Sequence, residues 1–576
     1  MKISNNSLSI ATWLKDYKKE YLRGDIYAGI TVGIMLIPQG MAYALIVGVP
    51  PVYGLYAAII PQIVYALLGT SRKLSIAPVA TDSLIVASGL STIAVTGTEN
   101  FLTLTIILAL IVGIIQLILG LVRMGFITNL LSRPVITGFT AAAAVIIGTS
   151  QLKHLFGITA QNKFDIVNAF AEIFSKHDSI QWLALLIGLM GIAIIVISKK
   201  ISKVIPGSLI AVLISIALVY FFGWNHEQIA ILKEIPQGIP SFEAPSVSFN
   251  DIQMLLPLAL TLALISFMES YSIAKAIEGP SKNHKINPNQ ELIALGSANI
   301  IGSLFQSFPT AGGFSRSAVN NEAGANTPLA SVISSIIVAL TLIFLTPVFY
   351  YLPKAVLASI ILVSIVNLVD GKYIRKLYFD NKFEFLIMIV TFLTTVVFSI
   401  VTGIITGISL SILYLLFKSA YPHIAQLGRV KDHHEFRNIK RFRDLEIWED
   451  VIILRVDASL SFINIQYFKD YIDLALNHSE ATIRTIILDA GPISFMDATA
   501  VNGIKEIILT LKEKNINFLI CDMIGPVRDT LHKSGLLSII NEENVFFNLT
   551  EAVRFATTKN QGRYKEYALQ SNIKTH

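Results

Sequence analysis

The chain has 576 residues, of which 53% are hydrophobic and 15% are charged, and its formal net charge is +6. Soluble domains carry about 25% charged residues, so this composition and a mean hydropathy of +0.63 exclude an ordinary soluble protein. One cysteine, Cys521, excludes an internal disulfide and a multi-cysteine metal site. The basic residues are scattered through loops and the tail, so the positive charge indicates no nucleic-acid partner and none is expected.

Apolar runs of nearly twenty residues recur along most of the chain. Each is long enough to cross a hydrocarbon core of about 30 Å, which predicts a polytopic α-helical membrane protein. After a cytoplasmic lead at 1–24, residues 25–225 are expected to form a first repeat of seven elements: Ile26–Val47, Val52–Leu68, an extended piece at Leu74–Ala80 with a short helix at Thr81–Ile93, Phe101–Val122, Val135–Gly148, Leu183–Ile197 and Pro206–Phe222.

Residues 250–420 are expected to form a second repeat of seven: Leu255–Ile273, Gln290–Phe305, a short helix from Phe314, Ala330–Phe349, Ala355–Val369, Phe385–Val401 and Gly403–Phe417. Because an odd number of spans turns the second copy upside down, 7+7 segments predict an inverted repeat.

The third element of each repeat is broken. Pro78 interrupts the first, and Gly312 and Gly313 interrupt the second, just before a short helix. Backbone that leaves its helix at membrane depth is tolerated only where it lines a cavity within protein. The N–H groups that begin a helix, together with the positive end of its dipole, favour an anion. Paired breaks therefore point to an anion site near the midplane; the alternative is that both are only kinks.

The substrate-binding candidates follow from these two breaks. Free N–H groups are expected at Val79, Ala80, Thr81, Phe314, Ser315 and Arg316. Such groups hold an anion without a full buried charge, which matters because a lone arginine at the bilayer centre costs about 2.5–3.5 kcal/mol on insertion scales. Arg316 would add a fixed positive charge and Ser315 a hydroxyl donor; the alternative for Arg316 is a side chain that snorkels to the interface.

Two polar residues of the first span lie on one helix face, because Gln39 and Tyr43 are four positions apart. Gln39 is expected to donate to substrate oxygens, with a hydrogen bond across helices as the alternative. For Tyr43 the two interpretations are a substrate contact and plain packing.

Two carboxylates inside predicted spans are candidates for ion coupling. An unpaired intramembrane carboxylate is costly, so Glu269 should be protonated, salt-bridged or ion-bound. A proton carried by Glu269 would remove charge from the transported load; the structural alternative is a pair with Lys275. Asp82 lies near the start of the first short helix, where it is either a plain N-terminal helix charge or a second proton site.

From about Gly428 the composition becomes that of a soluble domain. Alternating strands and helices predict a small α/β domain over residues 435–560, followed by a tail at 561–576. Its strands are expected at Val451–Val456, Ile483–Leu488 and Phe518–Cys521, and its helices near Ile465–Leu476 and Ala500–Lys512.

Fourteen segments return the chain to its starting side, so this domain and the N-terminus should share one side of the membrane. Lysine and arginine mark cytoplasmic loops, and they gather on that same side: Arg72, Lys73, Arg123, Arg133, Lys199, Lys200 and Lys275. The loop at 151–179 is the exception to this rule. A multi-pass protein with a cytoplasmic N-terminus and cytoplasmic α/β domain is predicted.

Three separated stretches resemble the sulfate permease (SulP) family of anion transporters. The sequence IPQGMAYALIVGVPPVYGLYAA at Ile37–Ala58, with its continuation to Ala80, is similar to the family's signature region, and FPTAGGFSRSAVNNEAGANTPLA is similar to its second hallmark. The sequence IILDAGPISFMDATAV at Ile486–Val501 resembles the STAS domain that closes these proteins. The resemblance covers nearly the whole chain, and the joint occurrence of three separated motifs is specific for this family.

The resemblance implies intertwined repeats, a core part that moves like an elevator against a gate part, and a homodimer. It places the family's binding-site serine and basic residue on Ser315 and Arg316, and an aromatic residue of the site on Tyr43. Some relatives hold Na⁺ with an aspartate where this chain has Glu269, so glutamate favours H⁺. In the STAS-like domain, antagonist relatives carry a phosphorylated serine just after the motif's aspartate.

This chain departs from that pattern, because Asp497 is followed by Ala498 and only then by Thr499. Asp497 and Thr499 are therefore the regulatory candidates, and phosphorylation is in doubt. No Walker loop or nucleophile triad is recognisable, so neither an enzyme nor an ATP-driven pump is expected, and no cofactor or metal is predicted.

The sequence favours a secondary-active transporter in the bacterial inner membrane, in contact with lipid, that carries a small oxyanion or carboxylate by H⁺ symport. Sulfate, bicarbonate and dicarboxylates all suit an N–H-lined site. The alternatives are a Na⁺-coupled bicarbonate importer, an uncoupled anion channel or exchanger, and a membrane-bound regulator whose STAS-like domain binds a cytosolic partner.

Overall fold

The computed structural model describes residues 11–14, 16–126, 132–158, 175, 180–202, 205–224, 228–278, 286–479 and 482–559. The first ten residues of the predicted lead, most of the 151–179 loop and the predicted tail at 561–576 lie outside the described residues. Contacts divide the chain into two units, Met1–Ser411 and Ile412–His576.

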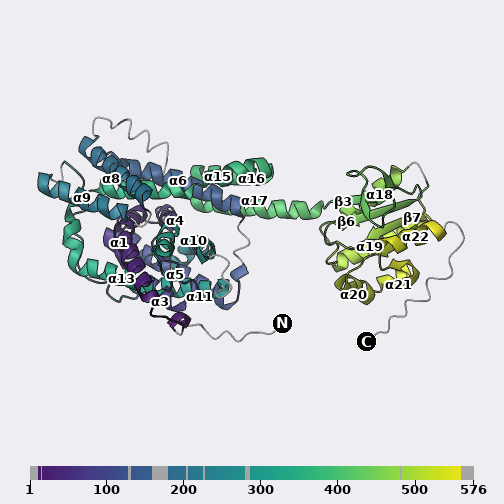
Figure 1. Cartoon of the computed structure of the whole chain (residues 1–576), viewed down its shortest axis with the longest axis horizontal. Helices are drawn as coiled ribbons and strands as arrows, with labels where there is room; N and C mark the ends of the chain where they lie inside the picture. Colours follow the sequence, from purple (N-terminus) through teal and green to yellow (C-terminus); the bar gives the residue numbers. More distant parts are fainter. Residues whose placement is uncertain are drawn as a thin grey trace. The chain divides into compact units, whose positions relative to one another are not determined.

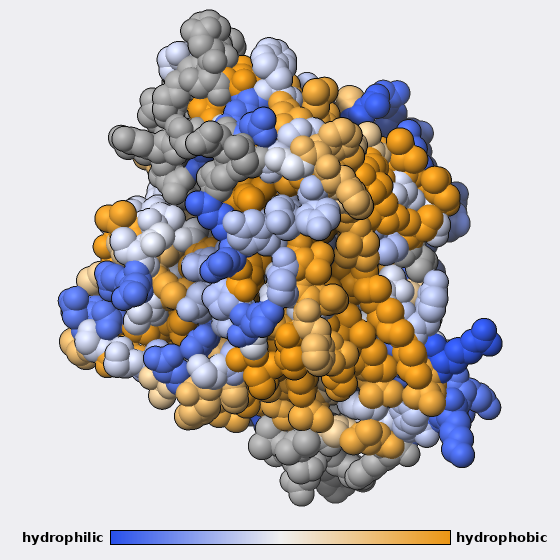
Figure 2. Space-filling model, turned by 90° about the vertical axis from the view of Figure 1, so that its left-hand side faces the viewer, coloured by the Kyte–Doolittle hydropathy of each residue, from blue (hydrophilic) through white to orange (hydrophobic). Residues whose placement is uncertain are grey.

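The first unit is helical (Figure 1). Within the described residues, eight helical stretches are long and apolar enough to cross a membrane, and three shorter apolar helices accompany them. Figure 2 shows a broad hydrophobic area on one face, with hydrophilic residues gathered at its edges. This arrangement suits a surface that meets lipid at its middle and water at its margins.

The described helices of this unit follow the predicted order, in which each of two repeats has seven membrane elements. The first seven are α1 (Tyr21–Val47), α2 (Pro51–Tyr56) with α3 (Ile60–Leu68), β1 (Ile76–Ala77) with α4 (Ala80–Leu90), α5 (Glu99–Leu121), α6 (Arg133–Leu155), α8 (Trp182–Ile201) and α9 (Gly207–Phe222). The second seven are α10 (Phe249–Glu278), α11 (Pro288–Ser303), β2 (Ala311–Gly312) with α12 (Phe314–Glu322), α13 (Leu329–Leu340), α14 (Lys354–Ile365), α16 (Lys382–Val397) and α17 (Ile400–Ala420).

The two predicted breaks meet each other. Strands β1 and β2 pair antiparallel, with Ile76 opposite Gly312 and Ala77 opposite Ala311. An antiparallel pair of equivalent segments is what an inverted repeat produces at its centre. Each strand leads into a short helix, so α4 and α12 both begin beside this pair.

The membrane unit differs from the prediction in several details, for example in α6, which continues to Leu155, and in α13, which ends at Leu340. The second expected span is two helices, because Pro61 has no N–H to continue the helix from α2 and restarts it in the first turn of α3. An additional amphipathic helix, α15 (Gly371–Asp380), precedes α16; the Asp370 side chain caps it by accepting from the Tyr373 N–H at 3.0 Å. The span expected to reach Val401 ends at Val397.

The second unit is a seven-stranded sheet with helices (Figure 1). Its order is β4-β3-β6-β7-β8-β9, and β5 pairs with β3; the strands from β6 to β9 are parallel, whereas β3 runs antiparallel to β6. The strands are β3 (Ile424–Val430), β4 (Phe436–Asn438), β5 (Leu445–Glu446), β6 (Val451–Val456), β7 (Thr485–Asp489), β8 (Asn517–Cys521) and β9 (Val545–Phe546). Strand β3 thus precedes residue 435, where the domain was expected to begin.

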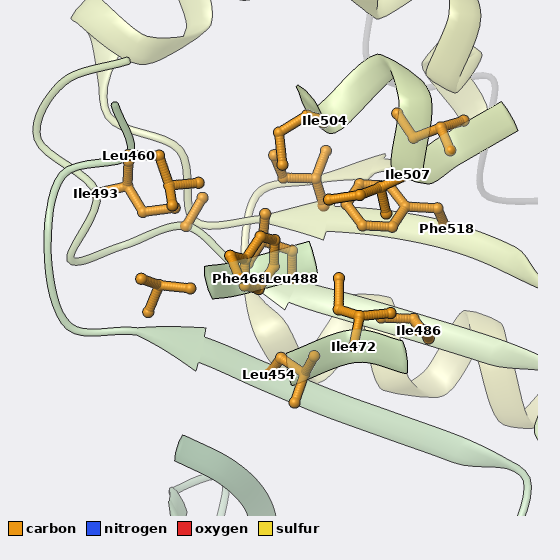
Figure 3. Packing of buried hydrophobic residues seen from close by; sticks show 14 of the residues in the cluster. Leu454, Leu460, Phe468, Ile472, Ile486, Leu488, Ile493, Ile504, Ile507 and Phe518 are labelled. Carbon is orange, nitrogen blue, oxygen red and sulfur yellow. The ribbon is translucent and has the colours of Figure 1, made fainter. Parts of the chain in front are cut away.

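Helices cover this sheet and bury its apolar residues. They are α18 (Ile465–Asn477), α19 (Ala498–Glu513), α20 (Gly525–Lys533), α21 (Leu536–Ile540) and α22 (Leu549–Lys559). Figure 3 shows side chains of the larger core, where Leu454, Leu488 and Phe518 from the strands pack with Phe468 of α18 and Ile504 of α19. All three predicted strands and both predicted helices are present, within two residues of their expected ends.

Candidate functional site

A cavity of about 430 Å³ lies in the membrane unit where the two short helices begin. Helices α1, α4, α10 and α12 contribute to its lining, as do α8, α9 and α14. The cavity brings together every predicted substrate-binding residue and one of the two predicted ion-coupling residues: Gln39, Tyr43, Val79, Ala80, Thr81, Phe314, Ser315, Arg316 and Glu269.

The helix starts leave N–H groups without helical partners. The first residue of α4 whose N–H donates within the helix is Ser83, at 2.9 Å from the Val79 carbonyl oxygen. In α12 it is Ser317, at 2.9 Å from the Gly313 carbonyl oxygen. The N–H groups of the preceding residues are therefore available at the positive ends of two helix dipoles. Such groups can bind an anion.

Arg316 is buried, with 2% of its surface exposed, so it does not snorkel to an interface. Its Nη1 donates to the Pro78 carbonyl oxygen at 2.8 Å and its Nη2 to that of Ala77 at 3.3 Å. The guanidinium thus satisfies carbonyl groups exposed by the break in the opposite repeat, while its Nε has no acceptor among the described residues. Arg316 both lines the cavity with positive charge and holds the two breaks together.

Two neighbouring residues of α10, Glu269 and Ser270, each accept a hydrogen bond from one of the two breaks. Glu269 is half-buried, and its Oε2 accepts from the Thr81 hydroxyl at 2.9 Å. The next residue, Ser270, accepts from the Gly312 N–H at 2.8 Å. Lys275 lies over the Tyr271 ring instead, 6.0 Å from its centroid, and no ion pair between described residues joins it to Glu269. The proposed pair with Lys275 is therefore absent from the described residues.

The first span contributes two buried side chains to the cavity wall. Gln39 is buried, and its Oε1 accepts no hydrogen bond from a described residue. Tyr43 is buried one turn further along α1. Sequence reasoning did not find the lining residues contributed by α8, α9 and α14, because nothing in those apolar spans marks the face that meets the cavity: Ile195, Lys199, Gly207, Ser208, Ile360, Val363 and Ser364.

Asp82 does not line the cavity. It is the third residue of α4 and has no exposed surface, and its two carboxylate oxygens accept no hydrogen bond from the described residues. Asp82 therefore does not cap α4, although it lies in the first turn, where a negative charge interacts favourably with the helix dipole.

The two regulatory candidates of the α/β unit have different surroundings. Asp497 caps α19, since its Oδ1 accepts from the Ala500 N–H at 2.8 Å and its Oδ2 from the Phe462 N–H at 2.9 Å. Thr499 is exposed in the first turn of the same helix. The structure gives Asp497 a clear structural role and leaves Thr499 accessible.

Asp489, Cys521 and Asp522 bring three possible ligand atoms within 4.8 Å of one another at the ends of β7 and β8. Burial raises the pKa of the Asp489 carboxyl. Burial, and then the charges of the two aspartates, raise the pKa of the Cys521 thiol well above its ordinary value. A metal ligand must be the thiolate, so this cluster is poorly suited to a metal.

The chain is similar to known proteins along nearly its whole length. Residues 22–391 match the Sulfate permease family, and residues 443–552 match the STAS domain. The chain is 36% identical over 560 residues to "Sulfate transporter 4.1, chloroplastic" of Arabidopsis thaliana, covering 94% of this chain and 81% of that protein. It is 32% identical over 567 residues to "High affinity sulfate transporter 2" of Stylosanthes hamata, covering 94% and 85%.

Solved structures agree with these matches. The murine Solute Carrier 26 family member A9 anion transporter, in the inward-facing state, superposes with a TM-score of 0.89 at 25% identity, covering 97% of this chain and 96% of that one. The transmembrane domain of a cyanobacterium bicarbonate transporter shares the fold, with a TM-score of 0.60 at 22% identity over 68% of this chain and 98% of that domain. The chain belongs to the sulfate permease family and is a multi-pass membrane anion transporter, not an enzyme, with a C-terminal STAS domain.

Proposed function

We propose that the chain is a secondary-active sulfate transporter that moves sulfate together with H⁺. The observation that carries this proposal is that two helix starts, Arg316 and Glu269 line one cavity. The relatives named above as sulfate transporters support sulfate over bicarbonate or a dicarboxylate. A tetrahedral oxyanion also suits N–H donors that approach from two opposed helices.

Glu269 is the residue proposed to carry the coupling ion. Its carboxylate lies in the cavity beside Thr81 and within electrostatic range of Arg316. Binding of sulfate would place two further negative charges near this carboxylate, and like charges at short range favour its protonation. Proton uptake and anion uptake are thereby linked at one place.

The helix packing supports an elevator-like movement. Helices α5 and α11 pack together, as do α1 and α13, whereas α14 packs on α6 and α8, and α16 packs on α6. The cavity is lined by members of both groups. A displacement of the first group against the second would carry the anion site with it. The homodimer and the cytoplasmic position of the N-terminus and STAS domain in a bacterial inner membrane are proposed on the resemblance and on the loop charges.

The test is uptake of labelled sulfate, bicarbonate and fumarate into proteoliposomes, each with an inward H⁺ gradient, an inward Na⁺ gradient, or neither. We expect sulfate to accumulate with the H⁺ gradient alone, and Glu269→Gln to lower that accumulation while it still exchanges sulfate for sulfate. The matched control is Glu291→Gln, which changes a fully buried glutamate of α11 outside the cavity lining.

Accumulation that follows Na⁺ would replace the proposal with a Na⁺-coupled carrier. Sulfate flux without any ion dependence would indicate a channel or exchanger. If no anion moves in folded protein, the regulator interpretation, with a cytosolic partner for the STAS domain, would take its place.

A further inference from the structure

Asp82 is a buried carboxylate for which the described structure provides no donor. It has no exposed surface, and neither of its oxygens accepts a hydrogen bond from a described residue. An ionised carboxylate can only accept, and burying it without donors or a cation is strongly unfavourable. In this conformation a proton on Asp82 removes that cost.

Two other buried carboxylates of the membrane unit, by contrast, accept several hydrogen bonds. Asp25 accepts from the Asn326 N–H at 2.7 Å, the Thr327 N–H at 3.0 Å and the Thr327 hydroxyl at 2.7 Å. Glu291 accepts from the Tyr65 hydroxyl at 2.6 Å and from three donors of Thr70 and Ser71. The fold thus surrounds both of these buried carboxylates with donors, whereas the described residues offer none to Asp82.

Asp82 also lies next to the proposed coupling residue. The hydroxyl of Thr81, its chain neighbour, donates to Glu269, and Glu269 is the charged group that acts electrostatically on Asp82. Ionising one of these two carboxylates therefore opposes ionising the other. Asp82 and Arg316 are each the third residue of their half-helix. The two breaks thus carry an acidic and a basic residue at the same helical position.

We propose that Asp82 and Glu269 form a two-carboxylate site that carries two protons with each sulfate. This inference rests on the proposed function and specifies its stoichiometry. Each proton comes from water on the side of entry, forms one O–H bond with a carboxylate, and returns to water on the other side when that bond breaks; no other bond changes.

Charge balance favours this stoichiometry. Two protons neutralise the two negative charges of sulfate, so binding of the complete load leaves the net charge of the site unchanged. The loaded carrier therefore moves no more charge across the low-dielectric interior than the empty carrier does.

The charged and titratable groups around the pair are few. Helix α4 packs on α1, α5, α6 and α10. Glu269 from α10 and, on the adjacent α12, Arg316 are close, and Tyr43 of α1 lines the same cavity. The remaining titratable groups of these four helices lie toward helix ends: Tyr21, Arg23, Asp25, Tyr27, Glu99, Arg133, Lys153, His154, Asp251, Tyr271, Lys275 and Glu278.

The test measures the pH difference that just stops net sulfate flux against a fixed sulfate gradient. Proteoliposomes hold the full chain, and potassium with valinomycin sets the membrane potential to zero. A tenfold sulfate gradient is balanced by about half a pH unit if two protons move and by about one pH unit if one moves. We expect about half a unit for the parent protein, with no change when the membrane potential is varied, because two protons and a dianion carry no net charge.

Asp82→Asn is expected to shift the balance point to about one pH unit and to make it depend on membrane potential. Asp25→Asn is the matched control, since it makes the same change at a buried aspartate that has donors, and it should keep the parent's balance point. A parent balance point of one pH unit overturns the inference, and so does an Asp82→Asn protein that stays at half a unit. If Asp82→Asn does not fold, the parent's balance point and its dependence on potential decide alone. A parent that neither accumulates nor exchanges sulfate refutes the proposed function itself, and the inference fails with it.

Discussion

Replacing Arg316 should weaken anion binding and loosen the centre of the repeat at the same time. The side chain is buried, makes two hydrogen bonds to carbonyl oxygens of the opposite break, and lines the cavity. Arg316→Ala removes the fixed charge and leaves the carbonyl groups of Ala77 and Pro78 without these donors. Arg316→Lys keeps the charge but loses the planar fork that reaches both oxygens.

The size of the effect follows from the bonds that are lost. A hydrogen bond that involves a charged group contributes about 1.5–3 kcal/mol. If one such contact is made to the anion, its loss raises the Kd for sulfate roughly 10- to 160-fold, because about 1.4 kcal/mol is a factor of ten. The two carbonyl oxygens, once unpaired, cost about 1–3 kcal/mol each. Arg316→Ala should therefore also lower the thermal stability of the membrane unit, and Arg316→Lys should do so less.

Sulfate binding by isothermal titration and sulfate exchange in proteoliposomes measure the first effect, and thermal unfolding of the detergent-solubilised protein measures the second. We expect weak binding with lowered stability for Arg316→Ala, and intermediate values for Arg316→Lys. If Arg316→Ala binds and exchanges sulfate with the parent's affinity, Arg316 does not contribute its charge to the anion site, and the reasoning is wrong.

Three predictions concern the STAS domain. Asp497→Ala removes the cap of α19 and should lower the free energy of unfolding of the domain by about 0.5–2 kcal/mol. The amides of α19 should then exchange hydrogen faster, while sulfate-for-sulfate exchange stays unchanged. If the α19 amides keep the parent's protection, the capping role is contradicted. Burial alone would raise the pKa of Asp457, but hydrogen bonds from Arg455 and His423 outweigh it and keep the pKa below its ordinary value. This stabilisation is complete above the unfolded pKa of about 3.9 and is lost as pH falls through the lower folded value. The amides of β6 should therefore lose protection from hydrogen exchange in acid, and Asp457→Asn should make that protection less dependent on pH. If the parent and Asp457→Asn lose protection over the same pH range, this prediction is wrong. Because burial raises the pKa of the Cys521 thiol, maleimide should label it at neutral pH only after denaturation, and rapid labelling of native protein would contradict this.

The sequence alone was sufficient to predict the architecture and to select residues that one cavity brings together. Long apolar runs identify spans by length, and proline or paired glycine residues mark the breaks, as at Pro78 and at Gly312. The pairing of β1 with β2 was not predictable, because two residues are too short to show an alternating pattern. Strand β3 was missed because it directly follows α17 and gave no separate signal.

The partners of individual residues were also beyond the sequence. Arg316 was identified as a binding residue, but its hydrogen bonds go to backbone carbonyl groups more than 200 positions away, and every residue has such a group. Glu269 was expected to meet an ion or Lys275, and its partner is a hydroxyl that the other repeat supplies. Lys199 lines the cavity from α8, although the basic residues around it predict only the cytoplasmic end of a helix.

The most direct test of the account is whether sulfate occupies this cavity during transport. Ser315 is exposed at the start of α12 and lines the cavity, and Cys521 is the only native cysteine. Ser315→Cys in a Cys521→Ala background should react with a water-soluble thiol reagent, lose sulfate exchange when modified, and be protected by sulfate but not by gluconate. Thr92→Cys, exposed beyond the other end of α4, is the control and should react without loss of exchange or protection by sulfate. Modification of Ser315→Cys that sulfate does not slow, or that leaves exchange intact, would contradict the assignment of the anion site to this cavity.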